Sequence, residues 1–339
     1  MSSPKVTVLM PVYNAEKYVG EAIESILNQT FKDFEFLIIN DGSTDKSLDV
    51  INSYSDPRIR VVNNETNLGL SPTLNKGIDL SNGEYIARMD ADDISLPTRL
   101  LKQSVYMDKH PEIGICGTWI EGFGNPLLCG IWKTQKNHDE LLCNLMYGSS
   151  FAHPSVILRK SILIKYQSIR YEDFYTPCED YRLWYSLLKV TKGANLQEVL
   201  LCYRRERDSN QMSEYMSTKI VTNTDCVRLD IVVDLLGGIS ESDKSFHIDL
   251  LNKVLPSDVN SCRKTVNWII SIIDANKMQK IFPEPTFRKK AARFLFAKLY
   301  SSVGNKAFNY LFTYPKFLLS VEKLYVIAKP FQKYFPSKQ

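Results

Sequence analysis

The sequence predicts an α/β fold in which a doubly wound, mostly parallel sheet is flanked by helices and followed by a mainly helical C-terminal extension. Short apolar runs alternate with amphipathic segments through the first part of the chain. That alternation stops near Arg205, and the later segments are helix-like. The chain has 339 residues, 44% hydrophobic and 24% charged, which is ordinary globular composition with enough length for a sizeable core.

The individual elements follow from local pattern. Five apolar runs are predicted strands: Val6–Val12, Phe34–Asn40, Ile59–Val62, Tyr85–Met89 and Ile113–Trp119. Helix-like segments lie between them, near Glu16–Asn28, Thr44–Tyr54, Pro72–Leu80 and Pro97–His110. The first helix has one apolar stripe, formed by Val19, Ala22, Ile23, Ile26 and Leu27, and the fourth is expected to begin with Pro97 at its first position. Such alternation predicts right-handed βαβ units and a parallel sheet.

The region from about residue 120 to 205 is less regular. It contains a helix-like segment at Asn137–Tyr147, a strand-like run at Ser155–Leu158 and a helix at Glu179–Val190, whose expected buried face is Trp184, Leu187 and Leu188. We therefore divide the chain into residues 1–210 and a helical region, 211–339, that is basic and aromatic from residue 286. Gly237-Gly238 is a candidate hinge.

Polar loops follow the first four predicted strands. Their sequences are PVYN (from Pro11), NDGSTD (from Asn40), NNETNLGL (from Asn63) and MDADD (from Met89). Open parallel sheets bind ligands beyond the carboxyl ends of their strands, so these loops should gather at one edge. Asn, Asp and Gly are common in turns, so their presence in any single loop needs no functional explanation. Polar residues in all four loops at one edge are poorly explained in this way, and we predict a binding site there.

Among the four loops, MDADD gives the most specific indication of a binding site. If the strand continues, Asp90 and Asp92 point to one side, roughly 7 Å apart. Their carboxylates would repel unless a cation neutralised them, and Mg²⁺ or Mn²⁺ prefers such oxygen ligands together with substrate phosphates. The alternative is capping of the next helix, a role expected above all for Asp93. We favour a metal and nucleotide site at Asp90 and Asp92.

VTVLMPVYN, NDGSTD, NLG and the D-x-D of MDADD, in this order, resemble the nucleotide-binding half of family 2 glycosyltransferases, especially bacterial enzymes of O-antigen and capsule assembly. The resemblance covers about residues 4–205. It implies the GT-A fold, with residues 1–95 as the nucleotide-binding half and 96–210 as the acceptor half. The implied activity is inverting, metal-dependent transfer of a hexose from a nucleotide sugar, one sugar per encounter.

The resemblance also implies roles for particular residues. Pro11 and Tyr13, with Asn14 beside them, should line the base pocket, and Asp41 should accept a hydrogen bond from the uracil N–H, which thymine also offers. UDP and dTDP sugars are therefore both candidate donors. Asp90 should serve the ribose or the metal, and Asp92 should bind the metal; Asn67 and Lys76 are weaker candidates for nucleotide contacts.

An inverting transfer needs a base that deprotonates the attacking hydroxyl. The family supplies it from an E-D pair ahead of a helix, which points to Asp180, with Glu179 as the substitute, in CEDYRLWYSLL. The competing explanation is stabilisation of the helix N-terminus by acidic residues. His153 also matches a family pattern and is a candidate contact to the acceptor or to the metal, although a lone histidine is more often structural.

Residues 286–339 contain eleven Lys and Arg, thirteen aromatic residues and one acid, Glu322, although the whole chain has a net charge of only +4. Two explanations stay open: contact with an anionic membrane surface, or a helical bundle with solvated lysines. Membrane contact would suit an acceptor linked to a polyprenyl diphosphate. The seven cysteines without a C-x-x-C pair, and the absence of a signal-peptide pattern, lead us to expect a cytoplasmic protein. Membrane contact of its C-terminal region would place it at the inner face of the plasma membrane. No nucleic-acid motif is recognised.

Two other functions are compatible with an α/β fold that binds a nucleotide. A sugar-1-phosphate nucleotidyltransferase also combines an α/β fold with Mg²⁺, but it would need a glycine-rich loop after the first strand, and PVYN contains no glycine. An inactive nucleotide-sugar-binding module would not need the intact D-x-D and E-D pairs.

Overall fold

The computed structural model describes residues 3–126, 129–205, 210–252, 256 and 258–303. It separates into two compact units, residues 1–227 and 228–339, and the division falls within one long helix, α8 (Asn210–Leu236). Within the described residues of the first unit, nine strands form one mixed sheet in the order β3-β2-β1-β4-β8-β6-β9-β5, with β7 paired to β6.

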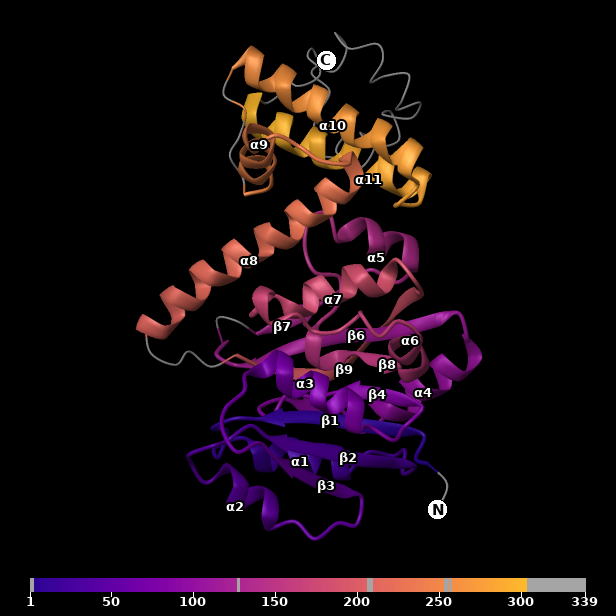
Figure 1. Cartoon of the computed structure of the whole chain (residues 1–339), viewed down its shortest axis with the longest axis vertical. Coiled ribbons are helices and arrows are strands. Elements are labelled where there is room, and N and C mark those ends of the chain that lie inside the picture. Colours follow the sequence, from indigo (N-terminus) through magenta and orange to yellow (C-terminus); the bar gives the residue numbers. More distant parts are fainter. Residues whose placement is uncertain (1–2, 127–128, 206–209, 253–255, 257, 304–339) are drawn as a thin grey trace, which may run out of the picture. The chain divides into compact units, whose positions relative to one another are not determined.

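The predicted parallel half of the sheet is confirmed. Strands β1 (Val6–Val12), β2 (Phe34–Asn40), β3 (Ile59–Asn63) and β4 (Tyr85–Arg88) are all parallel to one another and lie in the order β3-β2-β1-β4 (Figure 1). β1 and β2 have the predicted bounds, and β1 is buried along its whole length. The chain moves from β1 outward to β3 and then returns to the other side of β1. This switch point is where open α/β sheets bind ligands.

The second half of the sheet is mixed, and here the sequence was less informative. β8 (Ile157–Arg159) runs antiparallel to both β4 and β6 (Ile113–Gly124), which is longer than predicted. β9 (Lys192–Arg205) was not predicted, and it pairs in parallel with β6 along most of its length. The short strands β5 (Ile94–Ser95) and β7 (Gly130–Trp132) were also missed.

Helices cover the sheet and largely match the predicted segments. In the first unit they are α1 (Val19–Leu27), α2 (Ser47–Asn52), α3 (Leu70–Leu80), α4 (Arg99–Lys109), α5 (His138–Asn144), α6 (Lys160–Lys165) and α7 (Glu179–Leu188), with 3₁₀ turns η2 (His153–Ser155) and η3 (Asp173–Tyr175). The predicted faces are buried at Val19, Ala22, Ile23 and Ile26 in α1 and at Trp184, Leu187 and Leu188 in α7. The expectation for Pro97 was wrong, because α4 begins two residues later with Thr98 as its N-cap.

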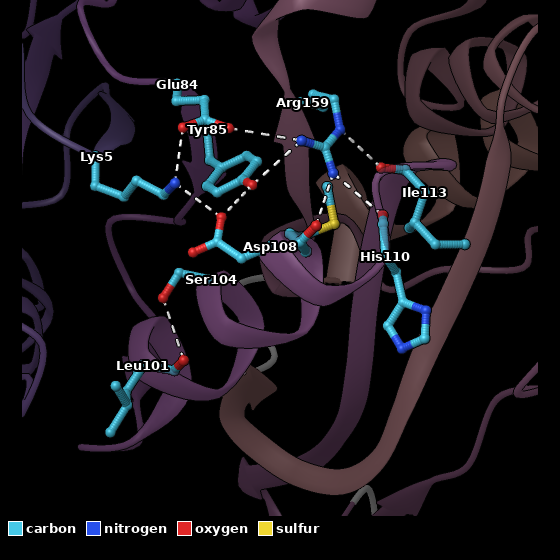
Figure 2. A network of polar contacts seen from close by, with 10 residues as sticks. Lys5, Glu84, Tyr85, Leu101, Ser104, Asp108, His110, Ile113 and Arg159 are labelled. Carbon is cyan, nitrogen blue, oxygen red and sulfur yellow. Dashed lines mark hydrogen bonds and ion pairs between the residues drawn. The ribbon is translucent and has the colours of Figure 1, made fainter.

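A polar network fastens the edge of the sheet that lies opposite the carboxyl ends of β1 and β4 (Figure 2). Arg159, at the end of β8, donates to the carbonyl oxygens of Ile113 (3.0 Å), Met107 (2.8 Å) and His110 (3.2 Å). Two of these carbonyls belong to the C-terminal end of α4, where backbone acceptors lack helical partners. The guanidinium therefore joins α4 to the sheet.

We expect Arg159→Met to lower the free energy of unfolding by about 2 kcal/mol, since it leaves partly buried carbonyl oxygens without a charged donor. Urea unfolding of the variant would measure this. The matched control is Lys102→Met, which removes the exposed ion pair to Glu198 and should cost below about 1 kcal/mol. Equal stability losses in the two variants would contradict the role given to Arg159.

The second unit is helical where it is described. Its helices are the end of α8, then α9 (Glu241–Leu251), α10 (Val259–Gln279) and α11 (Glu284–Val303). α11 packs against α10 and buries Phe287 and Phe296, while Lys289 and Arg293 stay exposed. This part of the basic, aromatic region therefore packs as in a helical bundle, and the remainder, from residue 304, lies outside the described residues. No described helix combines the length and the apolarity needed to cross a membrane.

Candidate active site

A cleft of about 390 Å³ lies at the carboxyl ends of β1, β2, β3 and β4. All four polar loops contribute to its lining, as the sequence predicted. The predicted residues that line it are Pro11, Tyr13, Asn14, Asp41, Asn67, Asp90 and Asp92, and Tyr18, Gly69 and Leu70 join them. The site is therefore assembled from segments far apart in the chain by the parallel register of the strands.

Asp41, the first residue after β2, organises the floor of the cleft. Its buried carboxylate accepts the side-chain amide of Asn64 (2.7 Å) and the backbone N–H groups of Leu68 and Gly69 (both 3.0 Å). Two of these bonds end on Oδ1 and one on Oδ2, so Oδ2 keeps acceptor capacity for a ligand donor. Loop stabilisation and ligand recognition are thus compatible roles for this one carboxylate.

Glycines let the β2–α2 and β3–α3 loops approach each other closely. Gly42 has φ +67°, and a Cβ on it would lie 2.6 Å from the backbone nitrogen of Asn67. Gly69 has φ +91° and is the N-cap of α3. Other residues would be strained in these conformations, so both glycines are needed to bring Asn67 and Leu70 to the cleft.

The β1–α1 loop presents an aromatic face to the cleft. Tyr13 is 49% exposed, although it directly follows a fully buried strand. The next residue, Asn14, has φ +48° and accepts the backbone N–H of Thr44 through its side-chain oxygen (2.8 Å). Ser43 in turn accepts the backbone N–H of Asn14 (3.1 Å). These bonds fix the loop while leaving the Tyr13 ring free to stack on a ligand.

Lys76 lies behind the cleft and does not line it. Its Nζ donates to the side-chain oxygen of Asn64 (2.6 Å), and the same Asn64 amide donates to Asp41. The chain of contacts therefore runs from Lys76 through Asn64 to Asp41. In the described structure Lys76 supports the position of Asp41.

Three carboxylates meet at the mouth of the cleft. Asp90, Asp92 and Asp93 follow β4, and one ligand atom from each lies within 4.8 Å of the others. The expected continuation of the strand was wrong, because β4 ends at Arg88 and the chain turns at Ala91 and Asp92. The turn brings the carboxylates closer together than an extended strand would. Among the described residues this is the group suited to a metal ion, and it does not include His153.

Asp93 does not cap α4, contrary to expectation. It is fully buried, and its Oδ1 accepts the backbone N–H of Arg204 on β9 (2.8 Å). Its Oδ2 is buried without a hydrogen-bond partner in the described structure. An orphaned carboxylate oxygen beside two further carboxylates is costly unless a cation or a proton satisfies it. The donor set therefore fits a hard divalent cation such as Mg²⁺ or Mn²⁺.

Burial and mutual repulsion raise the pKa values of Asp92 and Asp93. Burial, with the negative charge of Asp90, raises the pKa of Asp92 to about 6. The same causes, with the charge of Asp92 added, raise the pKa of Asp93 to about 8. A bound cation would relieve this repulsion, so protons and metal should compete for the site.

Arg88 lies between the cluster formed by Asp90, Asp92 and Asp93 and an acidic pair, Glu179 and Asp180. It is the last residue of β4, only 3% exposed, and forms an ion pair with Asp90. Its positive charge also acts to lower the pKa of Asp93, Glu179 and Asp180. Sequence reasoning missed this residue, although an arginine ending an otherwise apolar strand was a signal of a buried charged site.

The second acidic pair, Glu179 and Asp180, opens helix α7. Glu179 is buried, its Oε2 has no hydrogen-bond partner, and burial with the adjacent Asp180 charge raises its pKa to about 7. Asp180 is only partly buried and accepts the backbone N–H of Tyr181 (2.6 Å). Burial raises the pKa of Asp180 to about 6. Asp180 is therefore the less buried residue of the pair, and its pKa is the lower of the two.

His153 packs beneath this acidic pair. Its Nδ1 lies 3.7 Å from Glu179 Oε1, and its Nε2 lies 2.9 Å from the hydroxyl of Tyr171. Burial and the charge of Arg88 hold the pKa of His153 well below its usual value. A neutral histidine in these contacts positions Glu179. A contact of His153 with a metal or with the acceptor stays a prediction.

Arg204 on β9 contacts the acidic loop after β4. Sequence reasoning missed this residue because β9 was not predicted. Its Nε donates to the backbone oxygen of Asp92 (2.8 Å), and its guanidinium lies over the rings of Tyr18 (4.3 Å) and Phe123 (4.5 Å). This residue holds the acidic loop against α1 and β6.

The chain is similar in sequence to known glycosyltransferases. The sequence profile described as Glycosyl transferase family 2 matches residues 7–166. An uncharacterized glycosyltransferase of Haemophilus influenzae is 31% identical over 274 residues, which are 75% of this chain and 84% of that protein. The Escherichia coli UDP-Gal:alpha-D-GlcNAc-diphosphoundecaprenol beta-1,3-galactosyltransferase is 32% identical over 61% of this chain and 76% of that enzyme.

The fold is also shared with a solved structure. The S. aureus TarS 1–349 structure in complex with UDP-GlcNAc superimposes with a TM-score of 0.58 at 19% identity, covering 86% of this chain and 87% of that one. The GT-A fold expected from the sequence is thereby confirmed. The profile match and the 31% identity to the Haemophilus influenzae protein over 84% of its length show that the chain belongs to glycosyl transferase family 2.

Proposed function

We propose that this glycosyltransferase moves a hexose from a UDP-sugar or dTDP-sugar to a hydroxyl of a lipid-linked saccharide, with inversion at the anomeric carbon. The observation that carries the proposal is one cleft lined by an exposed Tyr13, by the carboxylate acceptor Asp41 and by Asp90 and Asp92, with Asp93 next to the last two. An aromatic face, a single acceptor and a cation site suit the base and the diphosphate of a nucleotide sugar.

Each part of the donor would find a suitable partner. The ring of Tyr13 offers a stacking face for the pyrimidine, and the free acceptor capacity of Asp41 Oδ2 suits the ring N–H of uracil or thymine. We assign Asp90 to the ribose or to the metal, since it lines the same cleft. Asp92 and Asp93, with Asp90, would hold the cation, which when bound would neutralise the charge that develops on the departing diphosphate.

The chemical step requires a proton acceptor for the attacking hydroxyl. We assign this role to Asp180, because it is more accessible than Glu179 and is ionised near neutral pH. Its carboxylate takes the proton of the acceptor hydroxyl as that oxygen attacks the anomeric carbon and the bond to the diphosphate breaks. Arg88 pairs with Asp90, and His153 contacts Glu179. These contacts hold the two acidic side chains in place.

The acceptor class and biological role rest on the relatives. The Escherichia coli galactosyltransferase acts on a sugar linked to diphosphoundecaprenol and uses UDP-Gal, and the TarS structure contains UDP-GlcNAc. By analogy we propose surface polysaccharide synthesis, such as O-antigen or capsule assembly, with Mg²⁺ or Mn²⁺ as the cofactor.

A donor screen tests the proposal. UDP and dTDP release would be measured over UDP-Glc, UDP-Gal, their N-acetyl and acid forms and the dTDP-hexoses, with and without diphosphoalkyl sugar acceptors. We expect one donor to give acceptor-stimulated release. Binding of UDP without release from any donor would favour the inactive binding module, and release of diphosphate from a nucleoside triphosphate and a sugar phosphate would favour the nucleotidyltransferase.

Tyr13→Ala should weaken UDP binding about tenfold, because stacking of a base on an aromatic ring contributes about 1–3 kcal/mol. Tyr13→Phe keeps the ring and should bind UDP nearly as well as the wild type. Titration calorimetry with UDP and Mg²⁺ would measure both. Since the side chain is half-exposed, neither change should alter the melting temperature. Unchanged affinity in the alanine variant would remove Tyr13 from the base pocket.

A further inference from the structure

A second cavity, of about 430 Å³, lies among β6, β7 and β9 and shares no lining residue with the nucleotide cleft. Its walls come mainly from Ile120, Gly130, Ile131, Trp132 and Tyr203, with Arg205 as a charged lining residue. The volume is within the usual range for small-molecule sites. Nothing in the sequence pattern had pointed to this place.

The strand directions put this cavity at the same edge of the sheet as the nucleotide cleft. β6 is antiparallel to β8, and β8 is antiparallel to β4, so β6 and β4 run in the same direction. β9 is parallel to β6 and pairs Tyr203 with Gly122 near the carboxyl ends of both strands. The residues that line the cavity on β6 and β9 therefore lie toward the same edge of the sheet as the acidic loop after β4.

Tyr203 links the two sites. It lines the second cavity, and burial together with the charges of Asp90 and Asp93 raises its pKa to about 12. The next residue, Arg204, donates its backbone N–H to Asp93 (2.8 Å), so Tyr203 lies beside the acidic loop. A ligand in the second cavity would therefore lie near the loop that we assign to the donor diphosphate.

The chemistry of the walls is that of a sugar site. Trp132 is 44% exposed and Ile131 is 50% exposed, which is unusual for side chains of this size in a sheet. A pyranose ring has an apolar face of C–H groups that packs on aromatic rings, while its hydroxyls need donors and acceptors at the rim. Arg205 supplies donors there, with its guanidinium 5.8 Å from the centre of the Tyr203 ring.

We propose that this cavity is the acceptor subsite, in which one pyranose ring of the saccharide acceptor lies against Trp132 and Tyr203 and Arg205 donates hydrogen bonds to its oxygens. The inference rests on the proposed glycosyl transfer and adds the place where the acceptor binds. The reacting hydroxyl would then approach the donor sugar from the side of β6 and β9.

Saturation-transfer NMR on the full chain tests this with methyl pyranosides of glucose, galactose, N-acetylglucosamine and N-acetylgalactosamine as probes, in the presence of UDP and Mg²⁺. We expect at least one pyranoside to receive saturation on its ring C–H protons. Trp132→Ala should reduce that signal at least about fivefold without changing the affinity for UDP. The matched control is Ile164→Ala, which removes a 58%-exposed apolar side chain on α6, outside both cavities.

The outcomes separate the two proposals. Failure of the wild-type chain to bind either UDP or dTDP would contradict the proposed function itself. UDP binding with no pyranoside signal, or with an equal signal in Trp132→Ala, would overturn the acceptor subsite alone. A kinetic readout adds a second check: Trp132→Ala should raise the KM for the acceptor, whereas the control Ile164→Ala should not.

Discussion

Asp92→Ala is expected to lower the rate of sugar transfer by more than about a hundredfold, the range seen when one group that stabilises developing charge is removed. The variant loses one of the three carboxylates that meet after β4, and the remaining two would hold a cation less well. UDP release in the presence of donor and acceptor would measure the effect. EDTA should reduce the wild-type rate to a similar level, and Mg²⁺ or Mn²⁺ should restore it.

A second readout does not depend on turnover. A ligand that binds only the folded state raises the melting temperature, so Mg²⁺ with UDP should stabilise the wild type but not Asp92→Ala. Because protons compete for Asp92 and Asp93, this stabilisation should weaken as the pH falls from about 8 through about 6. Asp49→Ala, which removes an exposed carboxylate on α2, is the control and should behave as the wild type. Full activity of Asp92→Ala, or of the wild type in EDTA, would exclude the metal role.

Asp180→Asn is expected to lower turnover by about 10²–10⁴-fold while leaving UDP affinity unchanged, because general base catalysis contributes on that scale. In the wild type the base must be ionised. Burial raises the pKa of Asp180 to about 6, so the rate should fall as the pH drops below about 6. A pH profile of kcat/KM, together with UDP titration of the variant, would measure both effects.

The control for Asp180→Asn must separate base catalysis from helix stabilisation. Asp139 occupies the first turn of α5 as Asp180 does in α7, so Asp139→Asn removes an equivalent charge near a helix N-terminus without touching the site. It should keep full turnover. Glu179→Gln completes the comparison, since a larger loss there than in Asp180→Asn would transfer the role of base to Glu179.

The nucleotide half of the site was predictable because its determinants are local. β1 and β2 are apolar runs bounded by polar loops, and each loop follows its strand directly in the chain. In a parallel sheet, residues directly after neighbouring strands meet at one edge whatever the detailed packing. The four loops could therefore be placed at one edge from their order in the chain, and the family resemblance singled out Pro11, Tyr13, Asp41, Asn67, Asp90 and Asp92 within them.

The rest of the site depends on contacts between residues far apart in sequence. The unpredicted β9 pairs with β6 and brings Arg204 and Tyr203 to the acidic loop, more than a hundred residues from Asp92 and Asp93. The turn after β4 depends on these contacts too, and it placed Asp93 inside the site instead of on α4. Arg88 stands out as a charged residue at the end of an apolar strand, but its partner Asp90 and its effect on Glu179 and Asp180 appear only in the folded chain.

The sequence by itself determined the family, the parallel half of the sheet and the acidic loop, because each is encoded by residues that are neighbours in the chain. The tertiary structure alone decided that three carboxylates share the site, that Asp180 is more accessible than Glu179, and that an apolar cavity lies between β7 and β9. Those features follow from burial and strand pairing, which depend on how distant segments fill space together.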